Sequence, residues 1–145
     1  MFKKSYLLII SFIITFSFTL AAQQPVNVVL PVDTIKNKAA IELCKKILAN
    51  DKSDPLFNHV SVFGNPDCAH CRDVEALMKE KNIAFDVYDL RDNNLLISIH
   101  DVIAAKNSSQ KMAYSFPIIL YKGEAYFNFK DANAFVDDLS LKMAQ

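Results

Sequence analysis

The chain has 145 residues, of which 16 are basic, 16 are acidic and 52% are hydrophobic. This length fits one domain with a packed core, and the balanced charge, without a basic block, argues against a nucleic-acid partner. With only two glycines, the chain lacks a glycine-rich loop that could cradle phosphates, and its three cysteines are too few for a scaffold held by several disulfides.

The first 21 residues are predicted to form a secretory signal peptide. Lys3 and Lys4 supply the positive start, residues 6–20 are apolar or hydroxyl-bearing, and Thr19-Leu20-Ala21 offers a small-x-small cleavage site. The run is short for a membrane span, although an uncleaved anchor reaching Ala22 is the alternative. We therefore expect a periplasmic or secreted chain of net charge near −2, since losing two lysines leaves 14 basic against 16 acidic residues. Contact with a membrane is expected only through the signal segment.

Residues 22–58 are predicted to form an N-terminal extension and a helix. Residues 23–32 are extended, as a linker or an added edge strand, and residues 50–58 are polar and end the helix. Cys44 lies on the apolar face of the helix and is interpreted as a buried apolar residue, with a regulatory or intermolecular thiol as the alternative. The helix begins at an Asp33-Thr34 cap and runs to about Leu48, with an apolar face made of Ala40, Ile41, Cys44, Ile47 and Leu48.

Residues 59–145 are predicted to form the main domain, with Cys68-Ala69-His70-Cys71 as its central feature. Residues 59–63 are expected to form a strand and residues 64–67 a turn. Val74, Leu77 and Met78 then recur at helical spacing, in a helix to about residue 82. Cys68 is thereby placed at a helix N-terminus, where the helix dipole favours an anion and cysteines of Cys-X-X-Cys motifs reach pKa values of roughly 3.5 to 7.5.

The rest of the chain predicts two more helices and three more strands. A strand over residues 84–90 completes a β-α-β unit with two parallel strands. An amphipathic helix around residues 95–103 and a polar loop over residues 106–115 follow. The pattern then predicts strands over residues 117–121 and 125–129, joined by a turn at Lys122-Gly123-Glu124, and a final helix capped by Asp131 with an apolar face made of Ala132, Phe135, Val136, Leu139 and Met143.

This order of elements, with the cysteine pair after the first core strand and Ser115-Phe116-Pro117 before the third, resembles the thioredoxin superfamily over residues 59–143. The chain is most similar to glutaredoxins, in the run of residues 60–72, in the Ile83-Ala84-Phe85 link, in Tyr88-Asp89-Leu90, and in the helix that precedes the core. The resemblance implies an α/β thioredoxin-like fold, in which helices flank a four-stranded mixed sheet and an extra helix lies at the N-terminus.

The resemblance also implies a substrate-binding role for Phe116 and Pro117. In thioredoxin-like folds a cis bond of this type lies opposite the cysteines, and the backbone of Phe116 would pair with an extended substrate segment. From the residues alone, an ordinary trans proline that starts a strand is the alternative. Glutaredoxins approach glutathione through a glycine pair, whereas this chain has Asn128-Phe129-Lys130-Asp131 there and matches only at Asp131. Glutathione therefore stays open as a partner beside protein thiols or disulfides.

These features predict a thiol–disulfide oxidoreductase whose redox-active disulfide joins Cys68 and Cys71. Cys68 is expected to attack and Cys71 to resolve the mixed disulfide. His70 is expected to stabilise the Cys68 thiolate, unless it is only an exposed polar residue, while Asp67 and Arg72 act on the same sulfur with opposite signs. No metal or organic cofactor is implied, because a structural zinc site needs further ligands. The alternatives are a non-catalytic thioredoxin-fold binding module and a metal-handling chaperone that uses Cys68, His70 and Cys71.

Overall fold

The computed structural model describes residues 32–106 and 113–145. The predicted signal peptide, the extended segment that follows it and most of the predicted loop over residues 106–115 lie outside the described residues. Every described helix and strand lies in the second of the two units into which the chain divides, Pro31–Gln145. Within the described ranges, no helix has the length and apolar character needed to cross a membrane.

A four-stranded mixed sheet forms the centre of the second unit, with the strand order β2-β1-β3-β4. Strand β1 (Val60–Gly64) pairs in parallel with β2 (Phe85–Asp89) and antiparallel with β3 (Ile118–Tyr121). Strand β4 (Glu124–Tyr126) pairs antiparallel with β3 and forms one edge of the sheet. The predicted fold class, including the parallel pair and the helix before the core, is confirmed.

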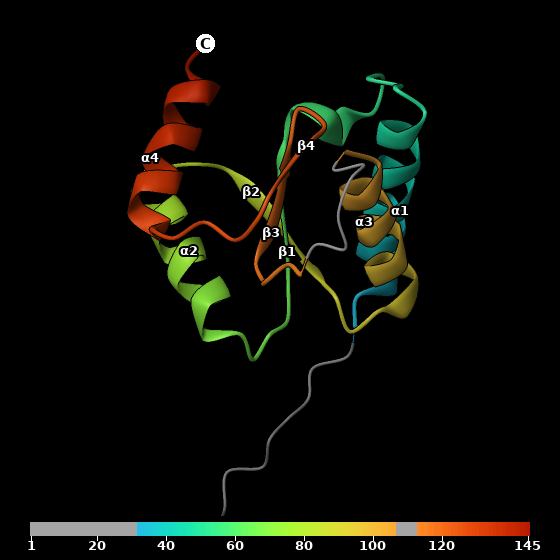
Figure 1. Cartoon of the computed structure of the whole chain (residues 1–145), viewed down its shortest axis with the longest axis horizontal. Helices are drawn as coiled ribbons and strands as arrows, with labels where there is room; N and C mark the ends of the chain where they lie inside the picture. Colours follow the sequence, from blue (N-terminus) through green and yellow to red (C-terminus); the bar gives the residue numbers. More distant parts are fainter. Residues whose placement is uncertain (1–31, 107–112) are drawn as a thin grey trace, which may run out of the picture. The chain divides into compact units, whose positions relative to one another are not determined.

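Helices cover both faces of this sheet (Figure 1). Helices α1 (Thr34–Leu48) and α3 (Asn93–Lys106) pack together on one face, and α2 (Ala69–Glu80) and α4 (Ala132–Met143) on the other. Strands β1 and β3 are buried along their whole lengths because both of their faces are covered. Each face therefore has its own apolar core, and the core under α1 and α3 contains the stacked rings of Phe63 and Tyr88, whose centroids lie 5.2 Å apart.

Aspartate side chains cap α1 and α4, two of the helices that flank the sheet. The Asp33 carboxylate accepts a hydrogen bond from the Lys36 N–H at 2.9 Å, and Asp131 accepts from the N–H groups of Asn133 and Ala134 at 2.9 and 3.1 Å. A carboxylate at this position satisfies free N–H groups and complements the positive end of the helix dipole. Both predicted caps, and with them the starts of α1 and α4, are confirmed.

Several sequence-based assignments differ from the structure. The stretch expected to be merely polar contains a 3₁₀ helix, η1 (Pro55–Asn58), because the Asp54 carboxylate accepts from the Leu56 N–H at 2.9 Å. Strand β1 begins one residue later than predicted. Strand β4 ends at Tyr126 instead of residue 129, since Asn128 adopts a left-handed backbone with φ 55°. On α1, helical spacing predicts Leu48 on the apolar face, but this residue is 43% exposed, whereas Leu43 is buried.

Asn37 connects α1 to the end of β2 and was not singled out by the sequence. The residue is 1% exposed, and its Nδ2 donates a hydrogen bond to the Asp89 carbonyl at 3.0 Å. Its Oδ1 accepts from the Asp89 N–H at 3.4 Å. The amide thus satisfies backbone groups of Asp89, which fixes α1 against the sheet at the same end as the cysteine pair.

Candidate redox-active site

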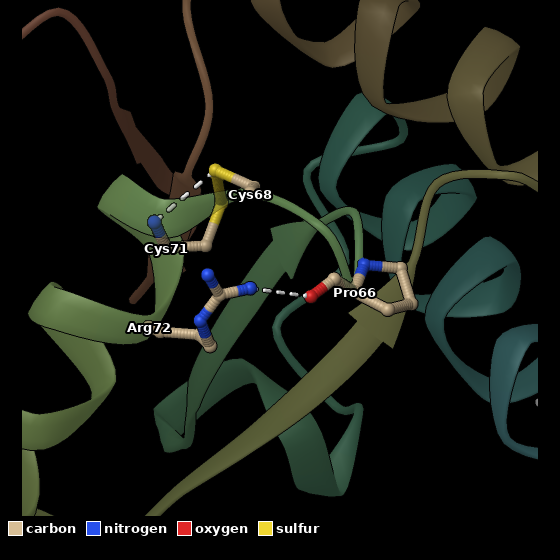
Figure 2. The surroundings of a disulfide bond; sticks show 4 residues. All are labelled: Pro66, Cys68, Cys71 and Arg72. Carbon is tan, nitrogen blue, oxygen red and sulfur yellow. Dashed lines mark hydrogen bonds between the residues drawn. A yellow bond between two sulfur atoms is a disulfide. The ribbon is translucent and has the colours of Figure 1, made fainter. Parts of the chain in front are cut away.

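Strand β1, a tight turn and the start of α2 position the cysteine pair. The Cys68 N–H donates to the Asn65 carbonyl at 3.0 Å, which closes the turn, and Pro66 occupies the second turn position that proline favours. The Arg72 guanidinium donates to the Pro66 carbonyl at 3.0 Å (Figure 2). These two bonds attach the turn to the first turn of α2.

Cys68 and Cys71 form a disulfide, with their Cα atoms 5.2 Å apart (Figure 2). Cys68 is the N-cap residue of α2, as predicted, and its Sγ accepts a hydrogen bond from the Cys71 N–H at 3.1 Å. Cys71 is 2% exposed, whereas Cys68 is only half-buried. The two sulfurs therefore differ in how easily a partner molecule can reach them.

Gly64 makes room for the inner sulfur. A Cβ atom added to Gly64 would lie 2.8 Å from the Cys71 Sγ and 3.4 Å from the Cys71 Cβ. The first distance is shorter than nonbonded atoms tolerate, so this position requires glycine for a close approach and not for its backbone angles. Sequence reasoning placed Gly64 in the turn and missed this role; the signal was a glycine at the end of the strand before the motif.

Four residues form a row across the end of the sheet where α2 begins. Gly64 pairs with Asp89 in the parallel register of β1 and β2. One further step of the β1–β3 register places Pro117 opposite Gly64, and two further steps of the β3–β4 register place Asn128 opposite Pro117. The Phe116–Pro117 bond is cis, as the resemblance implies. Two predicted site residues, Cys71 and Pro117, are thus both neighbours of Gly64.

His70 lies on the exposed first turn of α2 and contacts an aromatic residue that sequence reasoning did not assign to the site. The ring centroids of His70 and Phe129 are 5.6 Å apart and the rings are tilted by 42°. Phe129 also stacks on Phe135 of α4, with the ring centroids 4.3 Å apart and an angle of 8° between the rings. The segment before α4 therefore reaches the cysteine motif, and Phe129 lies beside its histidine.

Charged groups lie at the β2 end of the row. The Asp89 carboxylate accepts from the backbone N–H of Arg91 at 2.9 Å and from its guanidinium. Hydrogen bonding to the Arg91 side chain holds the pKa of the Asp89 carboxyl below its ordinary value. The pKa of Arg91 is raised, mainly by the same bond to Asp89 and in smaller part by the charge of Asp67. The Asp67 carboxylate, which is next to Cys68 in the sequence, therefore has the Arg91 guanidinium near it.

Cys44 is buried and unpaired, which confirms its interpretation as an apolar core residue. Burial raises the pKa of the Cys44 thiol to about 12, with a smaller contribution from the charge of Asp101. A thiol that stays protonated near neutral pH is a poor nucleophile. Among the described cysteines, Cys68 and Cys71 are therefore the candidates for thiol chemistry.

The four-stranded sheet and its flanking helices form a thioredoxin-like α/β fold, with the disulfide at the start of α2. Residues 60–125 match the family model for glutaredoxin, so the chain contains a glutaredoxin-like domain. The match runs from β1 into β4 and includes both cysteines and Pro117, while α1 and α4 lie outside it. No curated protein and no solved structure matches the chain. The match supports a redox role of the thioredoxin type.

Proposed function

We propose that this protein is an exported thiol–disulfide oxidoreductase that exchanges disulfides with protein thiols. The observation that carries the proposal is a cysteine pair at the N-terminus of α2, within a glutaredoxin-like domain, with one accessible and one buried sulfur. In such a pair, the accessible sulfur can react with a client protein, and the buried sulfur is close enough to attack the accessible one afterwards.

The reaction has two exchange steps. In the reduced protein, the Cys68 thiolate attacks one sulfur of a client disulfide; a Cys68–client bond forms and the other client sulfur leaves as a thiolate and takes up a proton. The Cys71 thiolate then attacks the Cys68 Sγ, which closes the Cys68–Cys71 disulfide and releases the second client thiol. Two electrons pass from the protein to the client, and the reverse sequence oxidises a client dithiol.

The geometry supports Cys68 as the attacking sulfur. Its Sγ lies at the positive end of the α2 dipole and already accepts the Cys71 N–H at 3.1 Å. Both effects favour a thiolate. Cys71 is 2% exposed, so its sulfur can reach the Cys68 Sγ more easily than it can reach a client disulfide.

Phe116 and Pro117 are the proposed client-binding residues. Strand β3 begins only at Ile118, so the backbone of Phe116 precedes the pairing of β1 with β3 in the described sheet. An extended client segment would pair with this backbone beside the sulfurs. The stretch Asn128-Phe129-Lys130-Asp131 lacks the glycine pair through which glutaredoxins approach glutathione, which favours a protein client over glutathione.

The test is turnover of insulin disulfides by the wild type and by single cysteine variants. We expect Cys68→Ser to abolish turnover, Cys71→Ser to trap clients as mixed disulfides, and Cys44→Ser to remain active as the matched control. Faster alkylation of Cys71 than of Cys68 at neutral pH would reverse the assigned roles. A wild type without turnover would instead favour the binding module or the metal-handling chaperone, which a metal titration separates.

The direction of electron flow follows from the reduction potential of the pair. A value near about −120 mV would mark an oxidant of client dithiols, and one near about −270 mV a reductant. Export is supported by the sequence pattern of residues 1–21, which predicts a mature chain starting near Ala22. Mass spectrometry of the protein from its native host checks this, and an intact Met1 in the membrane fraction would contradict it.

A further inference from the structure

The side chain of Asn128 joins two segments that are distant in sequence. Its Oδ1 accepts hydrogen bonds from the Ser115 N–H at 2.7 Å and from the Ser115 hydroxyl at 2.8 Å. Its Nδ2 donates to the Ala113 carbonyl at 2.9 Å. Because a backbone N–H can only donate and a carbonyl can only accept, these partners fix the orientation of the amide. All three bonds hold the segment that leads into the cis proline.

The position of Asn128 explains why a side chain is needed there. Asn128 falls opposite Pro117 when the β3–β4 register is extended by two steps beyond the pair Ile119–Tyr126. Proline has no N–H, so the backbone ladder cannot continue through this pair. Beyond the end of the ladder, the Asn128 side chain reaches past Pro117 to Ser115 and Ala113 and joins the two segments with three hydrogen bonds.

The backbone conformation of Asn128 allows its side chain to make these three hydrogen bonds while the chain continues toward Phe129. Its φ of 55° lies in the left-handed region, which asparagine tolerates better than most residues. The following residue, Phe129, contacts His70 of the cysteine motif. One residue thus sets both the segment before Pro117 and the aromatic contact at the motif.

We infer that Asn128 is a positioning residue that holds Ser115, Phe116 and Pro117 ready for an extended protein client. The inference rests on the proposed function. The row from Asn128 through Pro117 and Gly64 connects this clamp to Cys71. A segment that is already ordered spares the client the free-energy cost of ordering it, so the clamp lowers the KM for a client that pairs with the Phe116 backbone. A small disulfide contacts only the two sulfurs and does not pair with the Phe116 backbone, so the clamp does not change its KM.

Two variants separate the hydrogen bonds from the backbone conformation. Asn128→Gly keeps the left-handed backbone without strain and removes all three bonds. Asn128→Asp keeps an acceptor for Ser115 but loses the donor to the Ala113 carbonyl. Asn82→Gly is the matched control, because Asn82 has a φ of 56° at the end of α2 and takes no part in the clamp.

The experiment measures kcat and KM with insulin and with hydroxyethyl disulfide, and the Cys68–Cys71 potential in a glutathione redox equilibrium. For Asn128→Gly we expect a rise of about tenfold in the KM for insulin, while the kcat, the turnover of hydroxyethyl disulfide and the potential stay unchanged. Asn128→Asp should fall between wild type and Asn128→Gly, and Asn82→Gly should match the wild type.

Two results would overturn the inference while leaving the proposed function intact. One is an unchanged insulin KM in Asn128→Gly; the other is an equal loss with both substrates, which would indicate a general structural role. If the wild type turns over neither substrate, the proposed function is wrong and the inference falls with it.

Discussion

Replacing Gly64 by alanine should make the Cys68–Cys71 disulfide easier to reduce. The new Cβ would lie 2.8 Å from the Cys71 Sγ, whereas nonbonded carbon atoms prefer about 3.5 to 4.0 Å, so one of the two groups must move by about 0.7 Å or more. In the disulfide the Sγ is held by its bond to Cys68 and cannot turn away. In the dithiol the Cys71 side chain can rotate, which relieves part of the contact.

The size of the effect follows from the cost of overpacking a buried site, about 1 to 3 kcal/mol. If this cost falls on the disulfide form alone, the reduction potential rises by about 20 to 65 mV, at about 30 mV for each 1.4 kcal/mol. The potential is measured in a glutathione redox equilibrium. Urea unfolding of both redox forms should show the larger loss of unfolding free energy in the disulfide form.

Gly123→Ala is the matched control for this experiment. Its Cβ would lie 2.9 Å from the Phe57 ring, and its φ of 76° disfavours alanine, so the variant should lose stability equally in both redox forms. Removing the Sγ tests the contact directly, because Gly64→Ala should cost less in a Cys71→Ala background. An unchanged potential, with equal destabilisation of the two redox forms, would refute the reasoning.

Two further predictions concern the histidine of the motif and the buried thiol. For His70→Leu we expect the potential to fall by about 30 to 65 mV, since a hydrogen bond to a charged sulfur is worth about 1.5 to 3 kcal/mol; an unchanged or higher potential in the same glutathione equilibrium would leave the helix dipole as the main stabiliser of the Cys68 thiolate. For Cys44, the raised folded pKa of about 12 against an ordinary value of 9.0 means that the unfolded chain loses this proton first, so the unfolding free energy should fall by up to about 1.4 kcal/mol per pH unit above pH 9. Urea unfolding at pH 8 and pH 10 should show a weaker dependence in Cys44→Ala, and identical slopes would contradict the assignment.

Local signals predicted most elements of the fold. Asp33 and Asp131 predicted the starts of α1 and α4, because a helix cap depends only on the three or four residues that follow it. The same local chemistry at Asp54 and Pro55 could have predicted η1, since an aspartate before a proline is a typical helix start. Element type and order were therefore accessible without the structure.

The features that depend on pairing across the sheet could not be predicted in this way. The clamp from Asn128 to Ser115 requires the pairing of β3 with β4, and the close approach of Gly64 to Cys71 requires the packing of α2 against the end of β1. Likewise, helical spacing on α1 could not decide between Leu43 and Leu48, because the packed helix α3 sets where the buried face ends. The contact of His70 with Phe129 joins residues almost 60 positions apart and left no local signal.

The hydrogen bond from the Cys71 N–H to the Cys68 Sγ has a consequence for the speed of exchange. This donor points at the sulfur while the disulfide is still closed, so the group that would hold the thiolate is in place before the charge develops. A site arranged in this way needs little reorganisation when electrons arrive. The encounter with a client, and not a rearrangement of the motif, would then limit the rate, and turnover should slow with rising solvent viscosity.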